Sequence, residues 1–244
     1  YLLTYNDALS ICERYNNENF IARHKNIEGY KVVTVDYFIC EYNDFANPLP
    51  NRPHVNAFDM RGTTFVFDKN DKLWNTFYML PKFFNLNQVE NTLYNNVKNK
   101  RIKTITSKED GSLIGFIKLP NGKIRAKTIG GFDSWHAKDA MKILTNEQSN
   151  YISNLLDSGY TPLFEFVSLK NRIVLKYPSV PELKLIGYRD NTKPFGFTFY
   201  YQDLSGVPFN TVGIIENETL DSLIEKAKHE KEIEGWVIQF ADGQ

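Results

Sequence analysis

Short strand-like segments separated by turn residues dominate the middle of this 244-residue sequence. Residues 63–68 and 73–80 are rich in aromatic and β-branched side chains, and the polar stretch 69–72 joins them, which predicts a β-hairpin. Residues 113–119 and 123–127 flank an Asn-Gly pair that readily adopts the positive φ angles of a tight turn. Further strands are predicted over residues 30–40, 102–107, 161–167, 172–175, 183–188, 195–201 and 236–240. The pattern predicts antiparallel sheets, with an antiparallel meander in the middle of the chain.

Helical spacing of apolar residues occurs in three other places. A short helix is predicted to begin at Asn6, residues 134–156 are predicted to be helical with a break near Thr145, and Asn217 is predicted to cap a last helix. Helices interspersed among clustered strands indicate an α+β domain of antiparallel sheets with flanking helices. The sequence contains no internal repeat and no linker rich in Ser or Gly, so one catalytic-sized domain with an N-terminal appendage is expected.

Charge and cysteine content restrict the possible functions. Lys plus Arg and Asp plus Glu are 29 each, so the formal net charge is zero. This excludes a positive field over the whole surface, and any phosphate binding must come from cations focused at one place. Cys12 and Cys40 are too few for a disulfide framework or a four-cysteine zinc site, which favours a reducing cytoplasm. No apolar stretch approaches the ~18 residues that span a bilayer, so no membrane association is expected.

The most informative motif lies between two predicted strands, at Lys108-Glu109-Asp110-Gly111-Ser112. A lysine at a strand end, followed by a glycine that lets the backbone turn sharply, can present its amine to a ligand. The amine is a nucleophile only when it is neutral, and burial or nearby positive charge lowers a lysine pKa enough to allow this. The alternative interpretation is a charged hairpin turn.

Three charged residues follow this motif in the chain. Glu165 lies within the otherwise apolar segment 163–167, where a carboxylate is costly unless it faces a ligand, a metal or a basic partner. Lys127 ends the strand after the Asn-Gly turn, and Glu234 precedes the last predicted strand. Taken alone, Lys127 and Glu234 are typical of solvated positions, so Glu165 is the strongest single candidate.

The order of these blocks resembles the covalent nucleotidyltransferase superfamily of ligases and capping enzymes. More narrowly, it resembles the phage RNA ligase 1 family, the type represented by the T4 phage enzyme. The blocks that carry the resemblance are Arg61-Gly62, residues 81–87, residues 108–112, residues 164–167 followed by 171–175, and Ile233-Glu234-Gly235. Residues 1–60 contain no matching block.

The resemblance implies a fold, a reaction and cofactors. Residues 1–60 would be an N-terminal appendage, and residues 61–244 an adenylyltransferase domain with an ATP-grasp-like nucleotidyltransferase fold. The reaction would be ATP-dependent joining of a 5′-phosphate and a 3′-hydroxyl RNA end through a lysyl-AMP intermediate, with Mg²⁺ or Mn²⁺ as the metal. A nicked tRNA is the candidate substrate, the expected state is a monomer, and the location is the cytoplasm, that of the host if a phage encodes the chain.

The resemblance also assigns roles residue by residue. Lys108 would be the nucleophile, and Lys127 a second active-site lysine. Glu165 would lie near the ribose, and Glu234 would bind the metal. The other positions implied to surround ATP are Arg61 and Lys82 at the phosphates, Val237 at the adenine, and Glu109, Asp110 and Gly111 in the nucleophile loop. By its own sequence, Lys82 could instead cover the apolar surface of its neighbours Phe83 and Phe84.

The end of the sequence departs from the family pattern. The family has a Lys-x-Lys element within roughly a dozen residues after the strand that follows Glu234-Gly235, and it has a helical C-terminal domain. The sequence stops at Gln244 before either of them, so we expect a fragment that seals RNA poorly on its own.

Three other functions compete with this one. A GTP-dependent mRNA capping guanylyltransferase uses a similar Lys-x-Asp-Gly motif, but residues 81–87 and 171–175 favour the RNA ligase. A DNA ligase is disfavoured because no DNA-clasp domain is present. The alternative from another class is a non-catalytic module that binds RNA ends or nucleotides.

Overall fold

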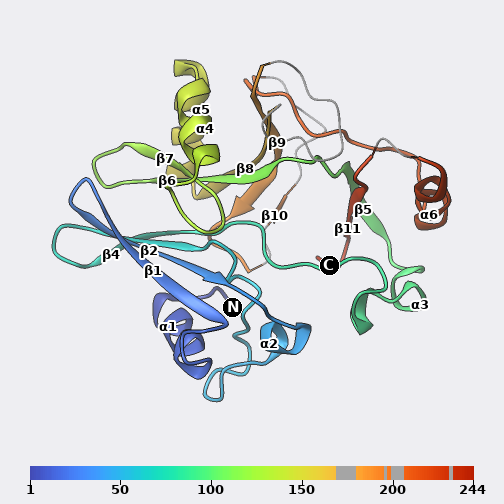
Figure 1. Ribbon diagram of the computed structural model, residues 1–244, viewed down its shortest axis with the longest axis horizontal. Helices are drawn as coiled ribbons and strands as arrows, with labels where there is room; N and C mark the ends of the chain where they lie inside the picture. Colours follow the sequence, from blue (N-terminus) through green and yellow to red (C-terminus); the bar gives the residue numbers. More distant parts are fainter. Residues whose placement is uncertain (169–179, 195–196, 199–205, 231–232) are drawn as a thin grey trace.

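The computed structural model describes residues 1–168, 180–194, 197–198, 206–230 and 233–244. The strands of this part form three antiparallel sheets (Figure 1). The first sheet has the order β1-β2-β3-β4, formed by Phe20–Ile27, Tyr30–Tyr37, Thr64–Phe67 and Leu73–Phe77. The second has the order β10-β9-β8-β6-β7, formed by Phe197–Thr198, Glu182–Asp190, Tyr160–Val167, Ser112–Lys118 and Ile124–Lys127. In the third sheet β11 (Trp236–Phe240) pairs with β5 (Ile102–Ser107). The predicted α+β class with antiparallel sheets is confirmed.

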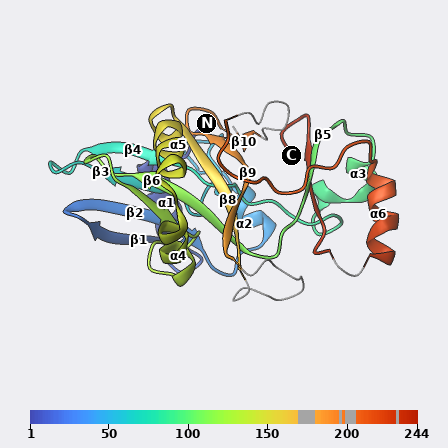
Figure 2. The same ribbon diagram turned by 90° about the horizontal axis from the view of Figure 1, so that it is seen from above.

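Helices cover the outer surfaces of these sheets. They are α1 (Tyr5–Arg14), α2 (Tyr42–Ala46), α3 (Tyr94–Val97), α4 (Trp135–Ile143), α5 (Asn146–Asp157) and α6 (Leu220–His229), with a 3₁₀ turn at Glu90–Thr92. α4 and α5 pack on the five-stranded sheet, whereas α3 and α6 lie beside the two-stranded sheet at the other end of the molecule (Figures 1 and 2). Within the described residues, no helix is both long and apolar enough to cross a membrane.

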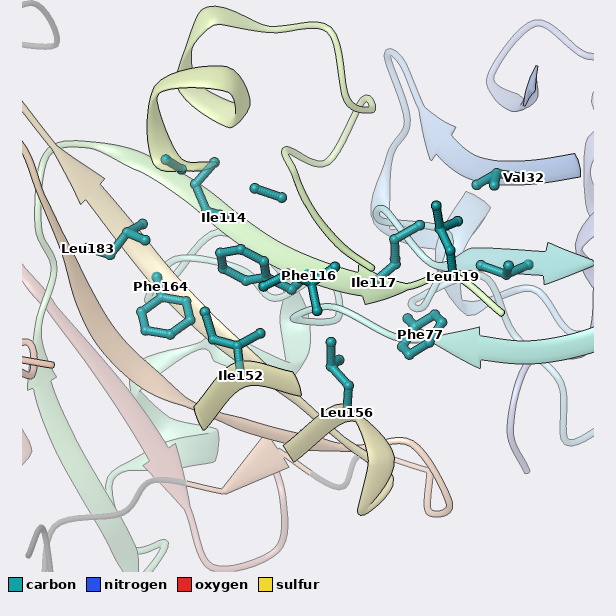
Figure 3. Packing of buried hydrophobic residues seen from close by; sticks show 14 of the residues in the cluster. Val32, Phe77, Ile114, Phe116, Ile117, Leu119, Ile152, Leu156, Phe164 and Leu183 are labelled. Carbon is teal, nitrogen blue, oxygen red and sulfur yellow. The ribbon is translucent and has the colours of Figure 1, made fainter. Parts of the chain in front are cut away.

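One hydrophobic core joins the two larger sheets. Ile152 and Leu156 of α5 pack toward Phe116 and Phe164 on β6 and β8 (Figure 3). The same cluster continues to Val32 on β2 in the first sheet. A second cluster, centred on Phe20, Phe45 and Phe65, lies between the first sheet and helices α1 and α2. Side chains from both of the larger sheets are therefore buried in one core, which fixes the position of one sheet relative to the other.

Several local predictions are confirmed. The predicted hairpin is formed by β3 and β4, although β4 ends at Phe77 rather than at residue 80, and β11 spans residues 236–240 as expected. The break in the helical region also lies where it was predicted, because Thr145 caps α5 by accepting a hydrogen bond from the Gln148 backbone N–H. The predicted strand 172–175 lies outside the described residues, and of 195–201 only β10 is described.

Other predictions are wrong. The middle of the chain is not a meander, because its consecutive strands belong to three different sheets. The last helix is capped by Thr219, while Asn217 lies in the preceding loop with a φ of 60°. Strand β1 was not predicted, because its central residues, Arg23, His24 and Lys25, are polar and lie partly or fully exposed on an edge strand.

The boundary placed after residue 60 falls in the connection between β2 and β3. These strands pair directly, with Val32 opposite Val66 and Thr34 opposite Thr64. Residues on both sides of the boundary thus contribute strands to one sheet, and the division into an appendage and a catalytic domain stays a prediction.

Candidate active site

Lys108 lies where the two-stranded sheet meets the five-stranded sheet. Residues 108–111 connect β5 to β6, and the Lys108 backbone N–H donates to the Gly235 carbonyl at 2.9 Å. This contact extends the pairing of β5 with β11 and brings Glu234 beside the lysine side chain. The Lys108 ammonium group forms an ion pair with the Glu234 carboxylate. The two side chains are 44% and 28% exposed, so a ligand can reach both.

Glu165 packs closely on the same loop, because Gly111 has no side chain to keep the two apart. A Cβ atom at position 111 would lie 2.4 Å from the Phe166 carbonyl oxygen and 3.0 Å from Cγ of Glu165, so no larger residue fits without a shift. Burial raises the pKa of Glu165 to about 8; the charge of Lys108 opposes the rise and that of Glu234 adds to it. A carboxyl group perturbed in this way and coupled to Lys108 is typical of a functional site.

Lys184 belongs to this group of residues, although sequence reasoning missed it. The register of β8 on β9 places Lys184 opposite Glu165, and its amine contacts a carboxylate oxygen of Glu109 at 3.2 Å. The argument that singled out Glu165, a charge within an apolar strand, applies equally to Lys184 in the predicted strand 183–188 and would have found it.

Arg61 lies within electrostatic range of Glu165. Its guanidinium group donates to the Leu80 carbonyl at 3.0 Å. Burial lowers the pKa of Arg61, while Tyr37, Asp36 and Glu165 act in the opposite direction. Arg61 therefore provides a partly buried cation on the side of the first sheet. The contribution of Tyr37 and Asp36 was not predicted, because it depends on the position of β2 beside the Arg61 loop.

Lys127 is the most deeply buried of the predicted site residues, with 1% of its surface exposed. Its amine donates to the carbonyl oxygens of Gly62 at 2.7 Å and Thr128 at 2.8 Å. Burial lowers the pKa of Lys127 to about 7, and the nearby negative charge of Asp36 opposes this change. Lys127 thus lies next to the residue that follows Arg61 rather than on a solvated strand face.

The remaining predicted residues are placed as follows. The Lys82 amine lies 5.1 Å from the ring centre of Phe84 and 5.4 Å from that of Tyr37, which fits the alternative that Lys82 covers an aromatic patch. Tyr37 also interacts electrostatically with Arg61, so the patch adjoins the site. Asp110 is buried, and Val237 lies on β11 opposite Thr106. The structure brings the Lys108 loop, Glu165 and Glu234 together, while the individual roles of all these residues stay predictions.

A metal ion would have to use few protein ligands at this site. In the part of the chain that the structure describes, no group of three or more His, Cys, Asp or Glu side chains is arranged to hold a metal. Mg²⁺ commonly binds through one or two carboxylates together with substrate phosphates and water. Glu234, which is partly exposed beside Lys108, supplies a hard oxygen donor of this kind. The donor set therefore fits a metal that enters with a phosphate ligand.

Gly111 provides a direct test of this packing. We expect Gly111→Ala to destabilise the chain by about 1–3 kcal/mol, because the new methyl group forces β8 and the Lys108 loop apart. Urea unfolding measures the change. Gly130→Ala is the matched control, since its Cβ would meet Asp36 at an ordinary 3.6 Å. Equal stability of the two variants would contradict the close packing of Gly111 on Glu165.

Comparisons with known proteins give the chain's family and its fold. A family model of the T4 RNA ligase 1 type, described as RNA ligase, matches residues 60–244. Two structures of an archaeal ATP-dependent RNA ligase, forms 1 and 2, are similar to the chain with TM-scores of 0.61 and 0.62 and identities of 15% and 14%. They cover 94% and 95% of this chain, which spans 57% of each of theirs. A Naegleria gruberi RNA ligase variant with ATP and Mn has a TM-score of 0.48, 12% identity, and coverage of 91% of this chain and 89% of its own.

At 14–15% sequence identity, the similarity to the archaeal structures shows that the chain shares their fold and nothing more specific. The family match is the stronger finding, because it covers most of the sequence and includes every residue placed in the site from Arg61 to Val237. The chain belongs to the RNA ligase family of the T4 RNA ligase 1 type.

Proposed function

We propose that this chain carries the nucleotide-transfer site of an ATP-dependent RNA ligase that joins 5′-phosphate and 3′-hydroxyl RNA ends through a lysyl-AMP intermediate. The observation that carries the proposal is the contact of Lys108 with Glu234, which are 126 positions apart, directly beside the perturbed carboxyl group of Glu165. The family match and the ATP-dependent archaeal relatives support the same reaction class.

In the first step, the neutral amine of Lys108 attacks the α-phosphorus of ATP. A P–N bond forms, the bond from the α-phosphorus to the bridging oxygen breaks, and pyrophosphate leaves with that bonding pair. The Lys108 ammonium group becomes neutral by giving one proton to the Glu234 carboxylate that it contacts, and the second proton, released when the P–N bond forms, leaves with pyrophosphate. Phosphoryl transfer depends mainly on positioning and charge stabilisation. Arg61 and Lys82 are the residues proposed to meet the phosphate groups, and Lys184 is a further cation beside the Lys108 loop.

In the later steps, AMP moves from Lys108 to the 5′-phosphate of an RNA end, and a 3′-hydroxyl then displaces AMP and seals the strand. The partners are therefore RNA ends, with nicked tRNA as the candidate substrate. A bound Mg²⁺ or Mn²⁺ would neutralise charge on the phosphate oxygens, and Glu234 is the residue proposed to hold it. The proposal includes a monomer acting in the cytoplasm, that of the host if a phage encodes the chain; the thiols of Cys12 and Cys40, which form no disulfide, are compatible with that compartment.

The test is covalent labelling. The chain is mixed with α-labelled ATP or α-labelled GTP and a divalent cation, and the denatured protein is examined for retained label. The proposal requires label from ATP. Preferential label from GTP would indicate a capping guanylyltransferase, and absence of label from both nucleotides would indicate a binding module.

The raised pKa of Glu165 predicts a pH-dependent stability. An unfolded glutamate releases its proton near 4.5, whereas the native carboxyl keeps it up to about 8. Between these values the native state binds more protons, so this group makes the free energy of unfolding fall as the pH rises. We expect Glu165→Gln to remove this loss, and to be more stable than the wild-type chain at about pH 9 but not at about pH 5.

Urea unfolding of both proteins across this range measures the difference. Lys127, whose pKa is lowered by burial, makes the free energy of unfolding rise with pH. This contribution is the same in both proteins and cancels in the difference between them. Glu147→Gln on the exposed surface of α5 is the control, and its stability relative to the wild-type chain should not change with pH. A Glu165→Gln curve parallel to the wild-type curve would show that Glu165 titrates normally.

A further inference from the structure

Arg189 is a fully buried cation outside the residues assigned to the reaction. It lies on β9 with 0% of its surface exposed. Its two terminal nitrogens donate to the two carboxylate oxygens of Asp59 at 2.9 and 3.0 Å, and one of them also donates to the Met79 carbonyl at 3.2 Å. The pair joins β9 of the second sheet to the loop between β2 and β3 of the first.

Stability alone does not explain this pair. Moving two charges out of water is costly, and replacing a buried ion pair by apolar residues of similar volume is often neutral or stabilising. The bidentate geometry does, however, fix the distance and direction between two backbone segments, since the guanidinium group is a rigid fork. The position of the two anchored segments therefore indicates what the pair is for.

Both segments lead directly to Arg61. Asp59 precedes Arg61 by two residues, and its carbonyl accepts a hydrogen bond from the Thr63 hydroxyl at 2.6 Å, which closes the loop around Arg61. Met79 precedes Leu80, whose carbonyl accepts the hydrogen bond from the Arg61 guanidinium group. Arg189 thus fixes the backbone that carries Arg61 and also the segment that supplies its hydrogen-bond acceptor.

A second contact from β9 strengthens the same segment. Asn191, which follows β9, accepts a hydrogen bond from the Tyr78 backbone N–H at 3.0 Å, immediately before Met79. The Met79 sulfur in turn lies 3.2 Å from the Lys127 amine. The end of β9 therefore supports residues 78–80 at two neighbouring backbone groups, and these residues contact both Arg61 and Lys127.

We propose that Arg189 is a positioning residue for nucleotide transfer: by holding Asp59 and Met79 it fixes the Arg61 guanidinium group where it meets the ATP phosphates. This rests on the proposed function, in which Arg61 binds ATP. Arg189 touches neither the nucleotide nor the reacting lysine, and acts only through Arg61.

The test replaces the ion pair by an apolar pair. Arg189→Met alone leaves Asp59 buried without its partner and is expected to unfold the chain. The double variant Asp59→Leu with Arg189→Met avoids this, and we expect it to melt within a few degrees of the wild-type temperature. Its KM for ATP in Lys108 labelling should rise about 10- to 100-fold, because a displacement of about 1 Å in a binding group has effects of this size.

A double-mutant comparison separates positioning from a general structural role. In an Arg61→Ala background, the double variant Asp59→Leu with Arg189→Met should raise the KM for ATP by less than about 2-fold, since Arg61 is no longer there to be positioned. The pair Lys118 and Asp157, which lies away from Arg61 on β6 and α5, serves as the control, and its replacement by Met and Leu should leave KM unchanged.

Two results would overturn the proposal. One is an equal loss of labelling in the wild-type and Arg61→Ala backgrounds. The other is an unchanged KM in the folded apolar double variant. If the wild-type chain itself takes no label from ATP, the proposed function fails and this inference is withdrawn with it. If the wild-type chain is labelled normally, but the losses caused by Arg61→Ala and by the apolar pair simply add, only the positioning role is rejected.

Discussion

We expect Lys108→Ala to lose covalent labelling from ATP by roughly 10³-fold or more, because the variant lacks the atom to which AMP is attached. Lys108→Arg should be equally inactive. It keeps a positive charge beside Glu234, but a guanidinium group is not deprotonated in proteins and offers no free electron pair. The pair of variants therefore separates a nucleophilic lysine from one that only neutralises charge.

Lys118→Ala is the matched control for this experiment. Lys118 ends β6, the strand that the Lys108 loop precedes, and its amine contacts Asp157 on α5. This variant should label at the wild-type rate, and circular dichroism should show that all three variants are folded. Peptide mapping of the labelled wild-type chain should place AMP on Lys108. Label on another lysine, or retained labelling in Lys108→Arg, would refute the assignment.

The elements that the sequence predicts well are those with local causes. The Asn-Gly turn before β7 and the Thr145 cap of α5 depend on neighbouring residues only, and both lie where they were predicted. The assignment of strands to sheets depends on contacts between distant segments. Lys108 to Gly111 carries the chain from one sheet to another, although the same residues could equally have closed a hairpin.

The candidate site shows the same division. Glu165 was found because a charge within an apolar strand needs an explanation, and its neighbour Lys184 satisfies the same criterion. Asp36 and Tyr37 could not be assigned to the site, because their effect on Arg61 requires the position of β2 beside a loop more than twenty residues away in sequence. Lys127 was placed in the site by resemblance alone, since a lysine at the end of a strand is typically solvated and its burial arises only from packing.

Glu234→Gln is expected to lower the rate of Lys108 labelling by about 100- to 1,000-fold, the usual loss when one preorganised electrostatic group is removed from a reacting centre. The amide keeps the size of the side chain and can still hydrogen-bond, but it neither pairs with the Lys108 ammonium group as an anion nor accepts its proton. It is also a weaker ligand for a hard cation than a carboxylate.

Titration with Mg²⁺ and with Mn²⁺ distinguishes these two contributions. If Glu234 binds the metal, the concentration needed for half-maximal labelling should rise in Glu234→Gln, and a chelator should abolish labelling of the wild-type chain. If Glu234 acts only on the lysine, the metal requirement should stay at its wild-type value while the maximal rate falls. Glu230→Gln, at the exposed end of α6, is the matched control and should change neither quantity. Wild-type labelling in Glu234→Gln would show that the ion pair with Lys108 has no part in the reaction.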